Sequence, residues 1–182
     1  GEPLPAEETP HRRTVGRSYA ISFYEVTVGQ YRAFIEDTQR PVPDACWGVS
    51  DTGRWGKLQG YHWLKPGFAQ DDEHPIVCVN AQDAQDYAVW LSKKTGQKWR
   101  LPTESEWEYA ARSESDTVYY WGDALDELCA NANGVDQTAK TKYPRWHSYD
   151  CNDGYVFTAP VGSYDDNAWG LHDMLGNVWE LT

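Results

Sequence analysis

The side chains that could form a core in this chain are mostly aromatic. The 182 residues include ten tryptophans, twelve tyrosines and four phenylalanines, although the hydrophobic fraction is only 40%. A low aliphatic content is typical of disorder, but each aromatic ring buries a large area and can replace missing aliphatic side chains. We therefore expect a single folded domain over residues 1–182, with core positions for most of the tryptophans.

The charge balance excludes one class of partner. The chain has 28 acidic and 16 basic side chains, for a formal net charge of -12. A surface of this sign repels phosphate backbones, so we expect no nucleic-acid partner. No stretch approaches the ~20 apolar residues that cross a bilayer, so we also expect no membrane span.

The four cysteines predict disulfides rather than a metal site. Cys46, Cys78, Cys129 and Cys151 form no CxxC pair and show no zinc-type spacing. Three complete pairings are possible. We favour Cys46–Cys78 and Cys129–Cys151, because each would close a loop-rich segment. Disulfides indicate an extracytoplasmic protein, and four buried thiols in a cytosolic protein remain the alternative.

Three capping patterns predict helices. In each pattern a capping residue stands three positions before a side chain that can bond back to it: Thr27–Gln30, Asn80–Asp83 and Thr103–Glu106. Apolar residues at helical spacing follow each cap. Gly96 is expected to end the second helix, since it follows Lys93 and Lys94, which suit the negative end of the helix dipole.

The rest of the chain shows little regular structure. Residues 1–18 are expected to form an extended lead-in, and residues 41–75 have no clear period. The only candidate strands are Val118–Trp121 and Phe157–Val161, set among Asn, Asp and Gly turns. Long loops in a compact domain usually carry function, a metal or a disulfide framework.

Two of these loops mix carboxylates with glycine and asparagine. They are Asp-Gly-Tyr at 153–155 and Asp-Met-Leu-Gly-Asn-Val-Trp-Glu at 173–180. Ca²⁺ prefers about six to eight oxygen ligands, some from carboxylates and some from backbone carbonyls. The EF-hand pattern does not fit, because a loop that begins at Asp150 has Val161 where the bidentate Glu should stand. Turn formation is the alternative role for these residues.

No common catalytic template is present. The five histidines show no HExxH spacing, and GxSxG, GxGxxG and P-loop patterns are absent from the sequence. No cysteine stands beside an evident histidine base. The residues alone therefore predict a disulfide-linked, loop-rich domain without a named reaction.

Several segments resemble the formylglycine-generating enzyme (sulfatase-modifying factor) family, in the family's order from about residue 12 onward. The most specific are RLPTESEWEYAAR at 100–112 and GNVWE at 176–180, supported by YEVT at 24–27, HPIV at 74–77 and TAPVGS at 158–163. The resemblance implies an α+β fold similar to the C-type lectin fold, with few helices, a small twisted sheet and largely irregular loops.

The resemblance also implies two structural calcium sites and part of an active cleft. The first site would use the side chains of Asn131 and Asp153 with the carbonyls of Ala132 and Tyr155; the second would use the side chains of Asp173 and Glu180 with the carbonyls of Gly176 and Val178. Trp179 and Glu25 match positions that line the family's active cleft, and they are the catalytic candidates.

The family's activity is the copper- and O₂-dependent oxidation of a substrate cysteine to formylglycine, or a related extracytoplasmic maturation reaction. Its two copper-binding cysteines follow the GNVWE run, and this chain ends at Thr182. We therefore expect no copper in this fragment and expect that the C-terminal part of the family domain is missing. The chain also begins with Gly1, which predicts a processed or trimmed amino terminus.

Two kinds of partner are compatible with the resemblance. An oxidase would act on a protein, a peptide or a small secreted substrate in the periplasm or outside the cell. The alternative is a catalytically inactive ligand-binding or interaction module with the same lectin-like fold. Exposed clusters among Trp47, Trp55, Trp63 and Trp146 would favour this module.

Overall fold

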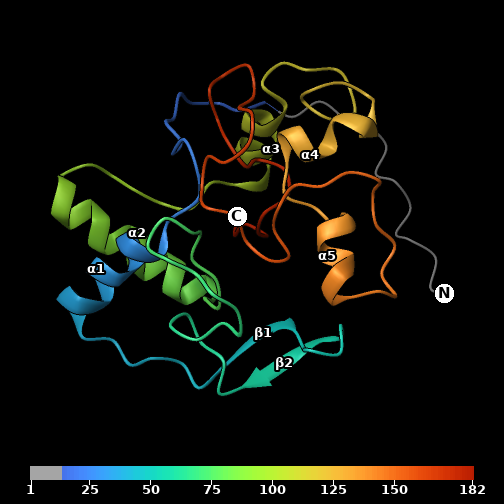
Figure 1. Cartoon of the computed structure of the whole chain (residues 1–182). Coiled ribbons are helices and arrows are strands. Elements are labelled where there is room, and N and C mark those ends of the chain that lie inside the picture. Colours follow the sequence, from blue (N-terminus) through green and yellow to red (C-terminus); the bar gives the residue numbers. More distant parts are fainter. Residues whose placement is uncertain (1–13) are drawn as a thin grey trace.

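The computed structural model describes residues 14–182. The elements follow in the order α1 (Val28–Thr38), β1 (Ala45–Val49), β2 (Trp55–Gln59), α2 (Ala81–Thr95), α3 (Glu104–Arg112), the 3₁₀ turn η1 (Leu125–Glu127), α4 (Leu128–Asn131) and α5 (Gln137–Lys142). In Figure 1 the α1–α2 pair and the β1–β2 hairpin lie below, α3 and α4 lie above, and long irregular segments connect them. The predicted α+β architecture with few helices and a small sheet is confirmed.

The three predicted helices are present with their caps. Thr27 Oγ1 accepts from the Gln30 N–H at 3.2 Å, and the Gln30 side chain accepts from the Thr27 N–H at 3.1 Å. The same reciprocal bonding begins α2 at Asn80 and α3 at Thr103. Gly96 ends α2 in the left-handed region, as predicted.

Other local predictions are wrong or fall outside the described residues. Residues 1–13 of the predicted lead-in lie outside them, and residues 14–18 belong to no helix or strand. The segment 118–121 makes only an isolated Tyr119–Gly122 bridge, and 157–161 forms no strand. Its backbone groups bond to loops instead: the Val161 N–H donates to the Glu73 carbonyl at 2.9 Å.

The sheet lies in the segment that shows no clear period. β1 and β2 pair antiparallel, with Trp47 opposite Lys57 and Val49 opposite Trp55. The Gly53 N–H donates to the Ser50 carbonyl at 2.8 Å, and Gly53 has a φ of 76°, so the chain reverses within a few residues. The hairpin therefore depends on its turn rather than on an alternating hydrophobic pattern.

Aromatic rings form the main core, as expected. Tyr31 of α1 packs against Trp63, and both Tyr31 and Phe34 pack against Tyr87 of α2, with ring centroids 5.5 to 6.1 Å apart. The expectation that most tryptophans are in the core is wrong. Five of them are exposed, between 38% and 99%: Trp47, Trp55, Trp99, Trp169 and Trp179. Tyrosine and phenylalanine supply much of the buried aromatic surface in their place.

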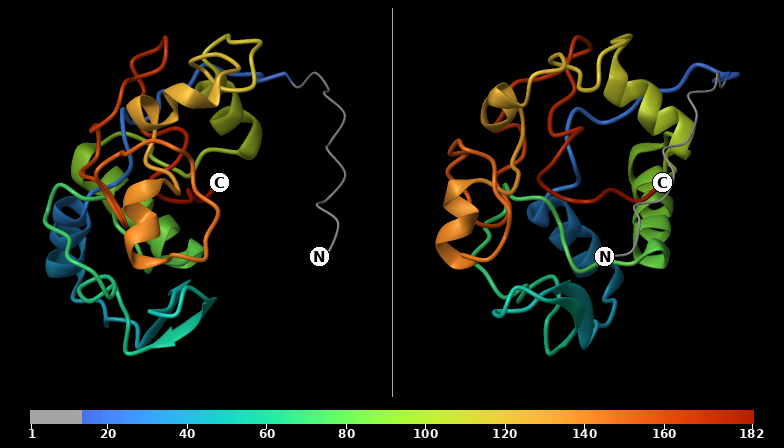
Figure 2. Two further views of the ribbon diagram at one scale, coloured as in Figure 1. Left: turned by 45° about the vertical axis from the view of Figure 1, so that its right-hand side comes forward. Right: turned by 90° about the vertical axis from the view of Figure 1, so that its right-hand side faces the viewer.

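Both favoured disulfides are present. Cys46 of β1 is bonded to Cys78, and Cys129 of α4 is bonded to Cys151, so no cysteine is free. The alternative of four thiols is thereby excluded. The second bond holds α4 beside the loop that continues to Asp153. Figure 2 shows that α4, α5 and this loop follow one another around one side of the molecule.

Among residues 14–182, no helix has the combination of length and apolar character needed to cross a membrane.

Candidate functional site

The loop 173–180 and the segment before α1 meet in a buried cluster of acidic side chains. Glu25 is 8% exposed and Asp173 is 2% exposed. The side-chain amide of Asn177 donates to Glu25 Oε1 at 3.1 Å. Asp173 and Asn177 both have positive φ, at 56° and 53°, which bends the loop sharply around the carboxylates.

Two oxygens in this cluster have no hydrogen-bond donor. Asp173 Oδ2 accepts from the Gly162 N–H at 2.6 Å, but Asp173 Oδ1 and Glu25 Oε2 are buried without a partner among the described residues. Burial, followed by the negative charge of Asp173, raises the pKa of Glu25 to about 9. Carboxylate oxygens this poor in donors require a proton or a cation.

Glu180 adds a third carboxylate to the cluster. Burial of its carboxyl group raises its pKa, the charge of Asp173 raises it further, and the Trp107 indole opposes both effects. Trp107 Nε1 is itself buried, and no acceptor within residues 14–182 lies in hydrogen-bonding position for it. Asp173 and Glu180 are the two side chains predicted for the second calcium site. The unpartnered Asp173 oxygen is a hard ligand of the kind that Ca²⁺ prefers, and Glu180 supplies a second carboxylate, so the residues present fit this ion.

Asn177 organises the cluster, and the sequence reasoning did not single it out. Its backbone N–H donates to the Asn133 carbonyl at 2.9 Å. Its Oδ1 accepts from the Ala159 N–H at 2.9 Å and from Asn133 Nδ2 at 3.2 Å. The Gly-Asn pair at 176–177 is the signal that could have found it, since both residues tolerate positive φ.

At Gly176 a side chain would not fit, because an added Cβ would lie 2.5 Å from the Asn133 carbonyl oxygen. The predicted ligand position therefore also has a packing requirement for glycine.

In the first predicted calcium site, the Asp153 carboxylate already has hydrogen-bond donors within the protein. Asp153 accepts from the Gly134 N–H at 2.9 Å and from the Tyr155 N–H at 2.8 Å, so both of its oxygens have a donor. Asn131 is buried at the end of α4, where its side-chain amide donates to the Glu127 carbonyl at 2.9 Å. Because both oxygens of Asp153 already accept hydrogen bonds, this site carries less support for an ion than the second site does.

Asp136 is a second residue that the sequence reasoning missed. It is fully buried and accepts from the Ala139 N–H at 2.8 Å, as the N-cap of α5, and from the Asp153 N–H at 2.6 Å. Burial acts to raise its pKa, but these N–H donors outweigh burial and lower it. Conversely, burial raises the pKa of Asp153, and the negative charge of Asp136 adds to that effect. An Asp followed by a short helical segment was the available signal.

Asp136, Asp153 and Cys129 place their ligand atoms within 4.8 Å of one another. Cys129 is in a disulfide, so its sulfur is not available as a thiolate.

The two catalytic candidates lie in opposite environments. Glu25 is buried in the cluster, whereas Trp179, which directly precedes Glu180 in the loop, is 99% exposed. The loop therefore buries Asp173 beside Glu25 and presents the Trp179 indole to solvent. Neither residue lines the two cavities described next.

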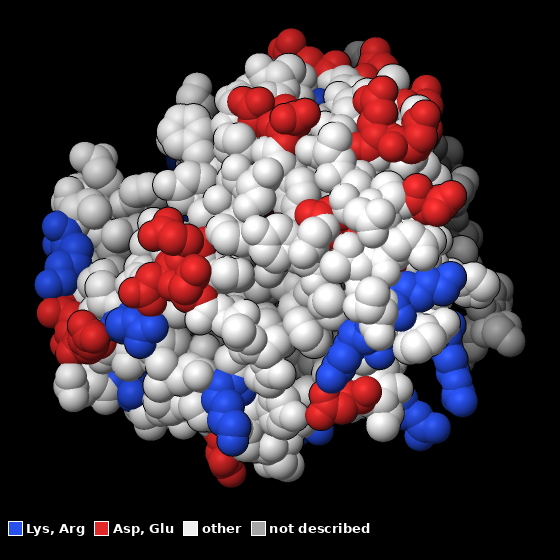
Figure 3. Space-filling model, in the orientation of Figure 1, with Lys and Arg blue, Asp and Glu red and all other residues white. Residues whose placement is uncertain are grey.

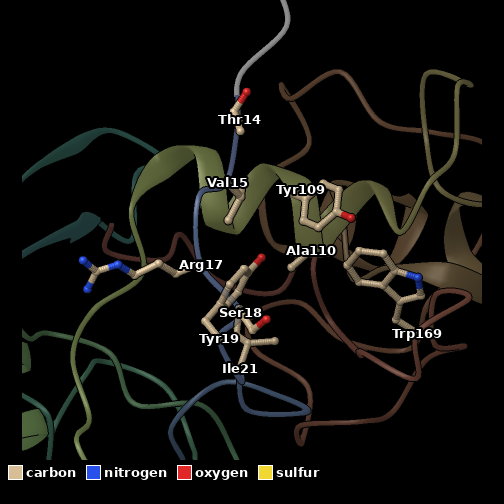
Figure 4. A pocket seen from close by; sticks show the side chains of 9 residues that line it. All are labelled: Thr14, Val15, Arg17, Ser18, Tyr19, Ile21, Tyr109, Ala110 and Trp169. Atoms are coloured by element: carbon tan, nitrogen blue, oxygen red, sulfur yellow. The ribbon is translucent and has the colours of Figure 1, made fainter.

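The larger cavity, of about 580 Å³, lies between the segment 14–21 and α3. Tyr109 and Trp169 form one wall with ring centroids 4.9 Å apart, and Tyr19 lies across from them (Figure 4). The Arg17 side chain points away from the two rings in that view. A smaller cavity of about 310 Å³ is lined by Trp107 and by the segment after α3.

The fold and the motif loop define the family. Residues 2–182 match the family described as "Sulfatase-modifying factor enzyme 1-like domain". The chain therefore belongs to the formylglycine-generating enzyme (sulfatase-modifying factor) family, and its fold is the C-type-lectin-like fold that the resemblance implied.

The similar proteins include one named as an enzyme and one named as inactive. The chain is 34% identical to the formylglycine-generating enzyme of Streptomyces coelicolor, a match that covers 99% of this chain and 62% of the relative. It is 29% identical to the inactive C-alpha-formylglycine-generating enzyme 2 of Bos taurus, with 96% and 62% covered. The solved structure of PvdO from Pseudomonas aeruginosa matches with a TM-score of 0.63 at 33% identity, over 84% of this chain and 51% of that one. The chain thus spans less than two thirds of the length of these relatives.

Proposed function

We propose that the protein containing this chain is an oxidase of the formylglycine-generating type, which oxidises a cysteine of a protein or peptide substrate with copper and O₂. The observation that carries the proposal is the arrangement of the 173–180 loop. Its first residue, Asp173, is buried with Glu25, while Trp179 near its other end is 99% exposed. A fully exposed indole on an anchored loop is well suited to contact a substrate chain.

Calcium would have a structural role in this protein. Asp173, Glu180 and the carbonyls of Gly176 and Val178 would hold one ion, whose charge would neutralise the buried carboxylates. The second proposed ion would use Asn131 and Asp153 with the carbonyls of Ala132 and Tyr155. Both ions would hold loops in place rather than take part in the oxidation.

Copper does not fit the residues of this chain. A dithiolate copper site needs two free cysteines, and all four cysteines are in disulfides. The oxidation step therefore rests on residues outside these 182, and this chain supplies the scaffold and part of the substrate surface. The two disulfides and the family support an oxidising, extracytoplasmic compartment.

The test uses the natural protein that contains this chain. The protein is incubated with copper, O₂ and a cysteine-containing peptide, and an aldehyde on the peptide is detected by mass spectrometry after capture with a hydrazide. We expect aldehyde formation, and Trp179→Ala is expected to lower kcat/KM by about tenfold, as loss of one good contact does. Trp99→Ala is the matched control, since Trp99 is also exposed and belongs to the turn after α2. Absence of aldehyde with the natural protein would contradict the oxidase.

One observation favours the second candidate, a ligand-binding module. Of the four tryptophans that discriminate the two functions, Trp63 is buried and Trp146 is half-buried against Tyr143. Trp47 and Trp55, in contrast, are 64% and 67% exposed and stack on each other. A pair of ordered, exposed indoles is a typical feature of binding surfaces.

A further inference from the structure

The two exposed indoles of the hairpin form a stacked pair at the surface. The ring centroids of Trp47 and Trp55 are 6.4 Å apart and their planes differ by 24°. The register places Lys57 directly opposite Trp47, so the Lys57 side chain leaves the sheet on the same face. The hairpin thus presents two nearly parallel rings beside a cation.

More cations surround this hairpin because its turn packs against the end of α5. Lys142 Nζ contacts Asp51 Oδ1 at 3.0 Å, and the Tyr143 hydroxyl donates to the Ser50 carbonyl at 3.4 Å. A Cβ added at Gly53 would lie 3.1 Å from Trp146 Nε1, so the turn lies close to the segment that follows α5. These contacts bring the basic residues of the turn and of α5 onto neighbouring surface.

Four of those basic residues are exposed and form no ion pair within residues 14–182: Arg54, Lys57, Lys140 and Arg145. Figure 3 shows the same contrast on this face of the molecule. Basic side chains gather over the β1–β2 turn and α5, while acidic side chains gather at the opposite end, near α4. Such a cluster in a chain of net charge -12 is complementary to an anionic ligand.

We propose that the hairpin–α5 surface, formed by Trp47, Trp55, Arg54, Lys57, Lys140 and Arg145, binds an anionic polysaccharide. Sugar rings have apolar C–H faces that pack on exposed indole faces, and carboxylate or sulfate groups on the same chain meet the cations. The binding is separate from the acidic cluster around Glu25. This inference rests on the ligand-binding role given second above, and it adds the ligand class.

The shape of the surface favours a glycan over an acidic peptide. A peptide anchors apolar side chains in pockets, but the two cavities described above are lined by residues of other segments. The stacked pair offers the outer faces of its rings instead. An acidic peptide is therefore the competing outcome of the test.

The experiment titrates the full chain with oligogalacturonate and follows tryptophan fluorescence and calorimetric heat. The methyl ester of the same oligosaccharide keeps the sugar rings and removes the charge. We expect binding of the acid that weakens with salt, and clearly weaker binding of the ester. Trp47→Ala and Trp55→Ala are each expected to lower the affinity by about tenfold, which is the size of one good stacking contact.

Charge variants provide the second measurement, in case a tryptophan substitution disturbs the hairpin. Arg54→Gln with Lys57→Gln should lower the affinity by about fivefold. Lys93→Gln with Lys98→Gln should leave it unchanged, because these two exposed lysines lie at and just after the end of α2 and form no ion pair within residues 14–182. Equal binding of acid and ester, or equal effects of the two charge pairs, would overturn the proposal. Binding of polyglutamate without oligogalacturonate would overturn the ligand class and keep the binding role. If neither oligogalacturonate nor polyglutamate binds, both the ligand class and the binding role are overturned. The proposed oxidase activity does not depend on this result.

Discussion

The side-chain amide of Asn177 donates a 3.1 Å hydrogen bond to Glu25 Oε1, although the two residues lie 152 positions apart. The bond joins the segment before α1 to the loop that contains Asp173 and Glu180. Asn177 also holds Ala159 and Asn133 through its side-chain oxygen. The acidic cluster therefore forms only when both ends of the described chain have folded together.

Replacing Asn177 with Asp should destabilise the protein through this contact. The substitution keeps the shape and the tolerance for positive φ, but it removes the donor and places a further carboxylate against Glu25. We expect the free energy of unfolding to fall by about 2 kcal/mol, as is usual for an unsatisfied buried polar group. Urea denaturation measures the change. The exposed Asn152→Asp is the matched control, with an expected change below about 0.5 kcal/mol; equal effects of the two variants would contradict the role given to Asn177.

Removal of calcium should lower the melting temperature. An ion that binds only the folded state stabilises it by about 2.7 kcal/mol at a concentration 100 times its Kd. Calorimetry with calcium and with EDTA measures the difference. Asp173→Ala should abolish most of the response to EDTA, because this residue contributes a buried oxygen without a donor. A melting temperature that does not respond to EDTA would show that these loops hold no calcium.

Stability at acidic pH should depend on Glu106. Two hydrogen bonds from Arg100, followed by the Thr103 N–H, lower the pKa of Glu106 from 4.5 to about 2. A lowered pKa stabilises the folded state above the unfolded value, and this contribution is lost as the pH falls from about 4.5 to about 2. Over this range the parent should lose more stability than Glu106→Gln does. The exposed Glu108→Gln should follow the parent curve, and a Glu106→Gln curve parallel to the parent's would refute the assignment.

Loss of the Cys129–Cys151 disulfide should destabilise the fold. The two cysteines are 22 positions apart, and closing a loop of this size is worth about 3 kcal/mol through the unfolded state. We expect the Cys129→Ala, Cys151→Ala double variant to lose about that much free energy of unfolding in urea titrations. Retention of the parent's stability would mean that α4 and the Asp153 loop hold together without the bond.

The features that the sequence predicted correctly are local or depend on specific motifs. Thr27, Asn80 and Thr103 predict helix starts because a capping bond spans only three residues. The GNVWE run predicts the family because its residue types follow one another without interruption. The disulfide pairing follows from the loops that each bond would close.

Only the tertiary structure decided which distant residues meet. Glu25 faces Asp173 and Asp136 binds the backbone of Asp153 through contacts between separate loops, and no periodic pattern encodes such contacts. The β1–β2 register likewise depends on a turn that packs against α5, and it exposes Trp47 and Trp55 where composition alone predicts burial. Local bonds are set by neighbours in sequence, whereas the burial of a charge or an indole is set by what the rest of the chain places over it.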